Sequence, residues 1–146
     1  MSLARSAFLT ALRTHQAIYQ RSGGLLGHRL FMGMPTLLLR TTGAKSGATR
    51  TNALVYAKDG DRWIVVPSNG GAPRHSAWLH NLRAQPRAEV QVGRRRTPVE
   101  AHEVRRGEPD FDRFWAEANR ANHGTYDKYQ AKTERQIPVV VLTPVG

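Results

Sequence analysis

The sequence of 146 residues contains no cysteine. Disulfide bonds, thiolate metal ligands, iron–sulfur clusters and a cysteine nucleophile are therefore excluded. No uninterrupted apolar run approaches the ~20 residues that a membrane-spanning helix needs. Residues 1–33 also lack the basic start, apolar run and small-residue cleavage site of a signal peptide. We therefore expect a cytoplasmic protein.

Acidic residues are scarce, since 11 Asp and Glu face 22 Lys and Arg and give a net charge of +11. None occurs before Asp59, so residues 1–58 carry +8 and the remainder carries +3. This asymmetry predicts an anionic partner for the N-terminal part of the chain. Nucleic acid, an anionic membrane surface and a polyanionic small molecule all fit that description.

The length and the 40% hydrophobic content predict one globular domain over residues 1–146, with a barrel domain over residues 36–144. Apolar periodicity predicts strands at 36–41, 50–58, 62–68, 88–92, 97–104 and 137–143, and helices at 73–84 and 109–122. A tyrosine-bearing segment, 123–135, precedes the last strand. About six mainly antiparallel strands with two to three helices, without βαβ alternation, indicate an α+β barrel rather than a doubly wound sheet.

Residues 1–22 read as an amphipathic basic helix, with apolar side chains at helical spacing and Gly23 and Gly24 at its end. Such a helix could pack on the barrel. Its arginines, together with Phe8 and Leu12, also suit peripheral contact with the inner face of the cell membrane.

Two hairpin turns punctuate the strands. Asp59, Gly60 and Asp61 form a strong hairpin signal between the second and third strands. Residues 93–96, Gly-Arg-Arg-Arg, predict a second turn. We interpret its arginine triplet as a solvated turn, with contact to a nucleic acid or an acidic tail as the alternative.

The segment 43–50, GAKSGATR, suits an anion. Glycines allow positive φ and close backbone approach, which exposes N–H groups, while Lys45 and Arg50 supply charge and forked donors. The segment is not a Walker loop, because Leu39 and Ala44 occupy the two glycine positions of that motif. An ordinary solvated turn is the alternative.

Three motifs occur in order: G-x-K-S-G-x-x-R from Gly43, S-x-G-G-A from Ser68, and W-x-x-N-L from Trp78. Together they resemble the deazaflavin-dependent nitroreductase family, small reductases that use coenzyme F420. The resemblance covers residues 37–144. It implies a split β-barrel related to pyridoxamine-phosphate oxidases and an F420H2-dependent reductase. The hydride acceptor would be a small electron-poor molecule: a quinone, an activated enone or a nitroaromatic.

The resemblance also implies a cofactor site. Its residues are Gly43, Ala44, Lys45, Ser46, Gly47, Thr49, Arg50, Pro67, Ser68, Asn69, Ala77, Trp78 and Asn81. Lys45 and Arg50 would hold the F420 phosphate, and Ser68, Trp78 and Asn81 would border the ring. Relatives commonly have basic residues at the positions of Ala44 and Asn69, which predicts a weaker grip on the tail here. Ser68 as a turn cap and Trp78 as a core residue are the alternatives.

Tyr126 and Tyr129 match family tyrosines beside the deazaflavin ring, and with Ser68 they are the predicted catalytic residues. Tyr126 or water would supply the proton; packing is the alternative role of both tyrosines. His123 stands where some relatives have another tyrosine, which would alter the substrate range.

We expect no metal site, because the six histidines do not cluster with carboxylates; His75 and His80 are five residues apart. FMN is the nearest alternative cofactor, since related barrels bind FMN or haem. The alternative from another functional class is a non-enzymatic basic module that binds nucleic acid or anionic lipid. The aromatic residues, however, do not alternate with basic ones as stacking platforms for bases require. We therefore expect no nucleic acid partner. A monomer and a homodimer both fit the sequence.

Overall fold

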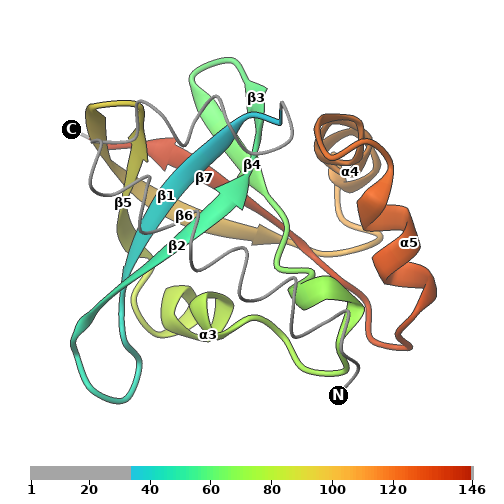
Figure 1. Ribbon diagram of the computed structural model, residues 1–146, viewed down its shortest axis with the longest axis horizontal. Coiled ribbons are helices and arrows are strands. Elements are labelled where there is room, and N and C mark those ends of the chain that lie inside the picture. The colour runs from blue at the N-terminus through green and yellow to red at the C-terminus, as the bar shows by residue number, and fades with distance from the viewer. Residues whose placement is uncertain (1–33, 146) are drawn as a thin grey trace.

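The structure is a computed structural model that describes residues 34–145. The predicted amphipathic helix at residues 1–22 lies outside the described residues. Figure 1 shows one curled sheet, with α3 beneath it and the pair α4 and α5 beside it. The α+β class is confirmed.

The sheet is antiparallel throughout and contains seven strands, one more than the six predicted. Their bounds are β1 Thr36–Thr42, β2 Thr49–Val55, β3 Ala57–Asp59, β4 Arg62–Val65, β5 Arg87–Val92, β6 Arg95–Val104 and β7 Val139–Pro144. Their order across the sheet is β2-β1-β5-β6-β7-β4-β3. The extra strand arises because the predicted strand 50–58 is divided into β2 and β3.

Tyr56 is the single residue between β2 and β3, although these strands lie at opposite edges of the sheet. One residue spans only about 3.5 Å. The two edges must therefore meet, and the sheet must curl on itself to bring them together. The backbone N–H of Tyr56 donates to the carbonyl oxygen of Pro35 at 3.0 Å, which fastens the junction to the start of β1. This closure gives the barrel that the sequence resemblance implies.

Both predicted hairpin turns are present, each with a glycine at its first central position. Gly60 has φ +63° between the paired residues Asp59 and Arg62, and Gly93 has φ +60° between Val92 and Arg95. The prediction of an arginine triplet in the second turn was wrong in detail. Only Arg94 lies in the turn, because a two-residue loop already closes the hairpin and the next two arginines belong to β6.

Three α-helices are present in the described part of the chain: α3 Ala77–Ala84, α4 Phe111–Ala121 and α5 Thr125–Ala131. The helix predicted at 73–84 starts four residues later, because Ser76 has extended backbone angles and residues before it are held in a loop. The helix α5 lies within the tyrosine-bearing segment, for which no helix was predicted. No described helix is long and apolar enough to span a bilayer.

The buried side chains form two clusters on opposite faces of β4 and β7. Val65 and Val140 pack inside the curl against α3, with Leu37, Leu39, Trp78, Leu79, Leu82, Val90, Val99 and Leu142. Ile64 and Val141 pack on the other face against α4 and α5, with Phe111, Phe114, Ala118, Tyr126 and Ile137 among others. Alternation along the strands therefore fills both the barrel and the layer outside it.

Charged contacts fasten α4 to the edge of the sheet. Arg113 of α4 donates to Asp59 at 2.8 Å, and Arg62 of β4 donates to the same carboxylate. Both guanidiniums lower the pKa of Asp59 below its usual value through these hydrogen bonds. The arginines also lie over the ring of Phe114, at 4.6 and 5.5 Å from its centroid.

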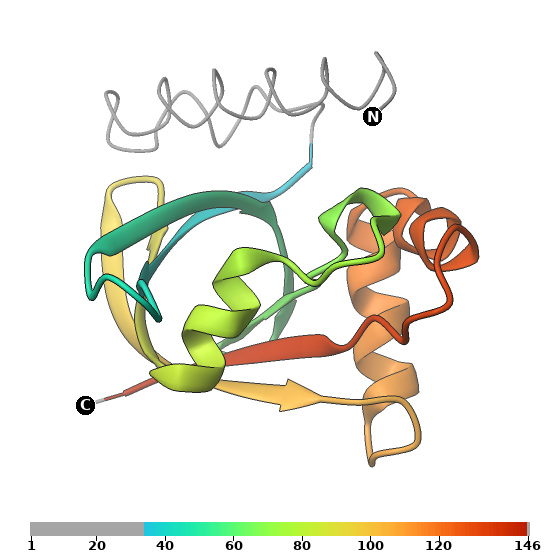
Figure 2. The same ribbon diagram turned by 90° about the horizontal axis from the view of Figure 1, so that it is seen from below.

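The turn Asn69–Gly71, which follows β4, packs against α5. Gly71 has φ +81°, and a Cβ built on it would lie 2.8 Å from the carbonyl oxygen of Tyr129 and 3.2 Å from its Cα. Only glycine permits both this backbone angle and this approach of two main chains. Figure 2 shows the turn and α5 on the same side of the barrel.

We expect Gly71→Ala to lower the melting temperature and to separate α5 from the turn, since a Cβ there meets backbone atoms. Gly107→Ala is the matched control, because Gly107 has φ +92° but open space around it. The shared cost of positive φ is about 1–2 kcal/mol. Thermal unfolding of the two variants measures the difference, and equal destabilisation would contradict the predicted contact.

Candidate functional site

The hairpin loop between β1 and β2 presents the GAKSG motif. The N–H of Gly43 donates to the carbonyl oxygen of Ala48 at 2.7 Å, and the N–H of Gly47 donates to that of Gly43 at 2.9 Å. The hydroxyl of Ser46 accepts from the N–H of Ala48 at 3.1 Å. A Cβ on Gly43 would lie 2.8 Å from that hydroxyl oxygen and 3.1 Å from the carbonyl oxygen of Ala48, so the compact loop leaves little room for a side chain there.

The same loop leaves charge and donors exposed. Lys45 and Arg50 are exposed, and neither forms an ion pair within the described residues. The backbone N–H groups of Lys45 and Ser46 have no hydrogen-bond acceptor in residues 34–145. The guanidinium of Arg50 lies across the loop, with Nε 3.6 Å from a Cβ built on Gly43. The predicted anion ligands are thus exposed on one loop.

Asn81 of α3 fastens this loop to the barrel. Its Oδ1 accepts from the N–H of Ala44 at 2.9 Å, and its Nδ2 donates to the hydroxyl of Thr41 at 3.1 Å. Both Asn81 and Thr41 are buried. The side chain predicted to border the cofactor therefore has a clear positioning role toward the loop.

The chain leaves β4 earlier than predicted and forms a tight turn at Ser68. The N–H of Ser68 donates to the carbonyl oxygen of Val66 across Pro67, at 2.9 Å. Asn69 and Gly70 then adopt left-handed angles, with φ +46° and +65°. The hydroxyl of Ser68 does not cap the turn. It is buried, and it has no hydrogen-bond partner in the part of the chain that the structure describes.

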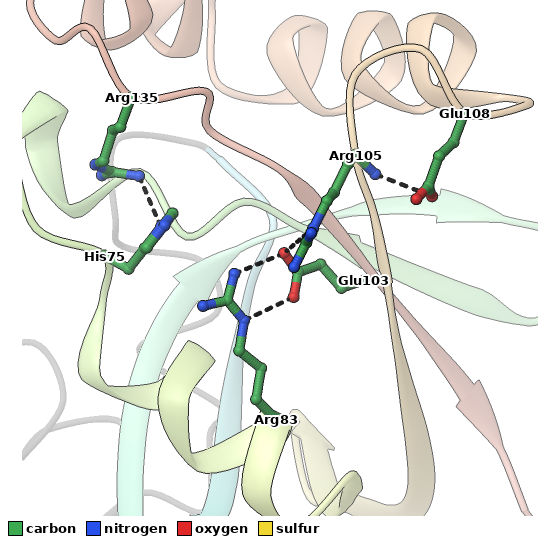
Figure 3. Close-up of polar contacts among 6 residues, drawn as sticks. All are labelled: His75, Arg83, Glu103, Arg105, Glu108 and Arg135. Atoms are coloured by element: carbon green, nitrogen blue, oxygen red, sulfur yellow. Dashed lines mark hydrogen bonds and ion pairs between the residues drawn. The ribbon is translucent and has the colours of Figure 1, made fainter.

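Arg135 holds this turn from outside, and sequence reasoning missed it. Its Nη2 donates to the carbonyl oxygen of Ser68 at 2.7 Å, and its Nε donates to that of Ala72 at 2.8 Å. Its Nη1 lies 3.1 Å from Nδ1 of His75 (Figure 3). The partners lie sixty or more positions earlier in the chain, so no local pattern could have revealed this contact.

Trp78 is buried inside the curl beside Leu82, as its alternative role predicted. Its indole N–H has no acceptor among the described residues. Ala77, the first residue of α3, is exposed, while Pro67 is buried. The helix α3 therefore connects the two predicted parts of the site, since Asn81 contacts the β1–β2 loop and Ala77 follows the segment that begins at Ser68.

The two tyrosines of α5 differ in their surroundings. Tyr126 is buried in the outer cluster, where its hydroxyl hydrogen-bonds with the side chain of Asn122. Burial raises the pKa of Tyr126 far above its usual value, and burial also raises the pKa of Tyr129. Tyr129 is half-buried, its backbone lies against Gly71, and its ring centroid is 6.4 Å from that of Tyr126.

His123 lies in the tight connection between α4 and α5, where it is exposed and has φ +54°. The rings of His75 and His80 approach to 6.1 Å between centroids. Within residues 34–145, no three His, Asp or Glu side chains gather as metal ligands would.

Comparisons with known proteins agree with this arrangement. A family model described as F420H(2)-dependent quinone reductase matches residues 11–144. An F420H(2)-dependent quinone reductase of Mycobacterium tuberculosis is 47% identical over 141 residues, which cover 97% of this chain and 95% of that protein. The solved structure of an F420-H2 dependent reductase, FDR-A, matches with a TM-score of 0.66 and 38% identity, covering 74% of this chain and 93% of that one.

A putative pyridoxamine 5'-phosphate oxidase from Listeria innocua has a TM-score of 0.54 at 13% identity, over 98% of this chain and 94% of that one. At that identity the likeness concerns the fold alone, and it confirms the predicted split barrel. The family model covers more than nine tenths of the chain. The chain therefore belongs to the F420H(2)-dependent quinone reductase family.

Proposed function

We propose that the protein reduces a quinone with reduced F420, whose anionic tail is held by the β1–β2 loop. The observation that carries this proposal is the loop itself. It combines two unpartnered N–H groups with Lys45 and Arg50, and neither cation has a carboxylate partner in the described structure. Reduced F420 would supply the hydride, and the residues of the chain would bind and orient the reactants and exclude water.

Two buried polar groups without partners favour binding of the heteroaromatic ring of F420 near Ser68. The hydroxyl of Ser68 and the indole N–H of Trp78 both lack partners among the described residues, although each residue is more than nine tenths buried. Buried donors without partners are costly unless a ligand satisfies them. Arg135 keeps the Ser68 turn in place, so that these groups are positioned before the cofactor arrives.

The basic charge elsewhere favours this function over a nucleic-acid module. Arg40, Arg62, Arg83, Arg87, Arg96, Arg105, Arg113 and Arg120 all lie within 4.0 Å of carboxylate oxygens. Much of the positive surface is therefore locally neutralised. The β1–β2 loop keeps its charge, which suits a small polyanion better than an extended backbone.

The structure favours Tyr129 over Tyr126 as the group that supplies a proton to the reduced acceptor. Burial raises the pKa of both hydroxyls, so both are protonated at neutral pH and each has a proton to supply. Tyr126, however, is enclosed in the outer cluster and already bonded to Asn122. Tyr129 is half-buried and lies beside the turn that carries Ser68.

Fluorescence titration with F420 and, separately, FMN tests the cofactor. We expect tighter binding of F420, with Lys45→Ala and Arg50→Ala each weakening it about tenfold, since each removes a charge-assisted contact. Arg94→Ala is the matched control, because Arg94 is exposed in another hairpin turn. Tighter binding of FMN, or equal loss in the control, would contradict the proposal.

Asn81→Ala tests the positioning of the loop. Removal of the amide leaves the N–H of Ala44 and the hydroxyl of Thr41 without their partner, and we expect a loss of about 1 kcal/mol in unfolding free energy. F420 affinity should fall severalfold although no charge has changed. His80→Ala, at an exposed neighbouring position of α3, should change neither quantity. Unaltered affinity in Asn81→Ala would show that the loop holds its shape alone.

Tyr129→Phe and Tyr126→Phe separate proton supply from packing. We expect Tyr129→Phe to lower the rate of quinone reduction by about a hundredfold, the lower range for general acid catalysis, with F420 affinity unchanged. Tyr126→Phe should mainly lower the melting temperature, because it loses the hydrogen bond to Asn122. The reverse pattern would assign the proton to Tyr126, and normal rates in both variants would assign it to water.

A further inference from the structure

A basic cavity lies on the side of α3 that faces β6 and β7, away from the β1–β2 loop. Its volume is about 300 Å³. Arg83 of α3, Glu103 of β6, the following Arg105 and Arg106, and His75 before α3 line it, together with Gln136 and Pro138. Figure 3 shows Arg83 and Arg105 directed toward Glu103, and His75 directed toward Arg135.

Glu103 organises the arginines of this cavity. Arg83 donates to both of its carboxylate oxygens at 2.8 Å, and Nε of Arg105 donates to Oε2 at 3.2 Å. The hydrogen bond from Arg83, the largest influence, lowers the pKa of Glu103, which stays ionised. One carboxylate thus orders two guanidiniums and neutralises only one.

Two cations have no carboxylate partner among the described residues: Arg106, which lines the cavity, and Arg135, which contacts the lining residue His75. Arg106 lies over the ring of Phe111, 5.4 Å from its centroid. Arg135, which is partly buried, donates to two backbone carbonyls and to His75. Glu108 accepts only from the backbone N–H of Arg105. Three arginines and one carboxylate therefore line the cavity, which leaves an excess of positive charge there.

His75 adds a neutral donor. Arginine only donates, so Nδ1 of His75 accepts from Arg135 and the ring proton resides on Nε2. The charged and titratable groups that face this ring are Arg135, Arg83, His80 and Glu103. Burial lowers the pKa of His75, and the two arginines lower it further. An anion placed among these groups would oppose that effect and raise the pKa.

We propose that this cavity binds the phosphate group of a small molecule, independently of the cofactor loop. Forked guanidinium donors match the oxygens of a phosphate, and a doubly charged anion offsets the excess positive charge. The volume lies at the lower end of the range for ligand pockets. A phosphate monoester or free phosphate therefore fits, whereas a dinucleotide does not.

Calorimetric titration at constant ionic strength tests this proposal, with inorganic phosphate in one arm and glycerol 3-phosphate in the other. We expect saturable binding that Arg106→Gln weakens about tenfold, since it removes a charge-assisted contact. Arg106 is exposed and forms no ion pair in residues 34–145, so the variant should fold, as its melting temperature will show. Tighter binding of the ester would identify the natural ligand as an ester, and equal binding would identify it as phosphate.

Two control variants locate the site. Arg94→Gln makes the same charge change at the opposite end of β6 and should leave phosphate affinity unchanged. Lys45→Gln should weaken F420 and spare phosphate, which separates this site from the cofactor loop. In NMR titrations, phosphate should raise the pKa of His75, with His75→Gln identifying the resonance. Absence of binding, equal loss in Arg94→Gln, or loss in Lys45→Gln alone would overturn the proposal.

Discussion

The junction at Tyr56 is the constraint on which the rest of the structure depends. One residue joins the two edge strands of a seven-stranded sheet, so the sheet has to curl until its edges meet. The curl leaves an interior that α3 covers, with Trp78, Leu79 and Leu82 packed inside it. Because α3 is fixed by this packing, it can hold the β1–β2 loop through Asn81 at one side and continue from the Ser68 segment at the other. The parts of the proposed cofactor site are therefore placed by the closure of the barrel.

Arginine serves two different purposes in this molecule. Most described arginines bind carboxylates or backbone carbonyls and hold elements together, as Arg113 does for α4 and Arg135 does for the Ser68 turn. Exposed ion pairs of this kind contribute little individually. Arg50 and Lys45, like Arg106, have no carboxylate partner within the described fold. The net charge therefore says less about binding than the positions of such unpaired cations.

Much of the fold could be predicted from the sequence, because hairpin turns and strand periodicity are local signals. The Asp-Gly turn after β3 and the closing strand β7 are examples. The division at Tyr56 could not be predicted, because it follows from the closure of the barrel. The late start of α3 could not be predicted either, because the preceding loop is held by Arg135, which is far away in sequence. For the site, the motif predicted the loop and its cations. The motif did not predict that Asn81 would hold the loop or that Tyr126 would be enclosed in the outer cluster, because these features are set by tertiary packing.

The two faces of β4 and β7 have a consequence for how this family diversifies. Side chains such as Val65 and Val140 belong to the barrel interior, whereas Ile64 and Val141 belong to the layer beneath α4 and α5. Substitutions in the outer layer can thus reshape the helix pair beside the Ser68 turn without changing the residues that support α3 and the β1–β2 loop. If α5 borders the acceptor as we propose, such a division lets the acceptor side change while the proposed cofactor contacts of α3 stay fixed.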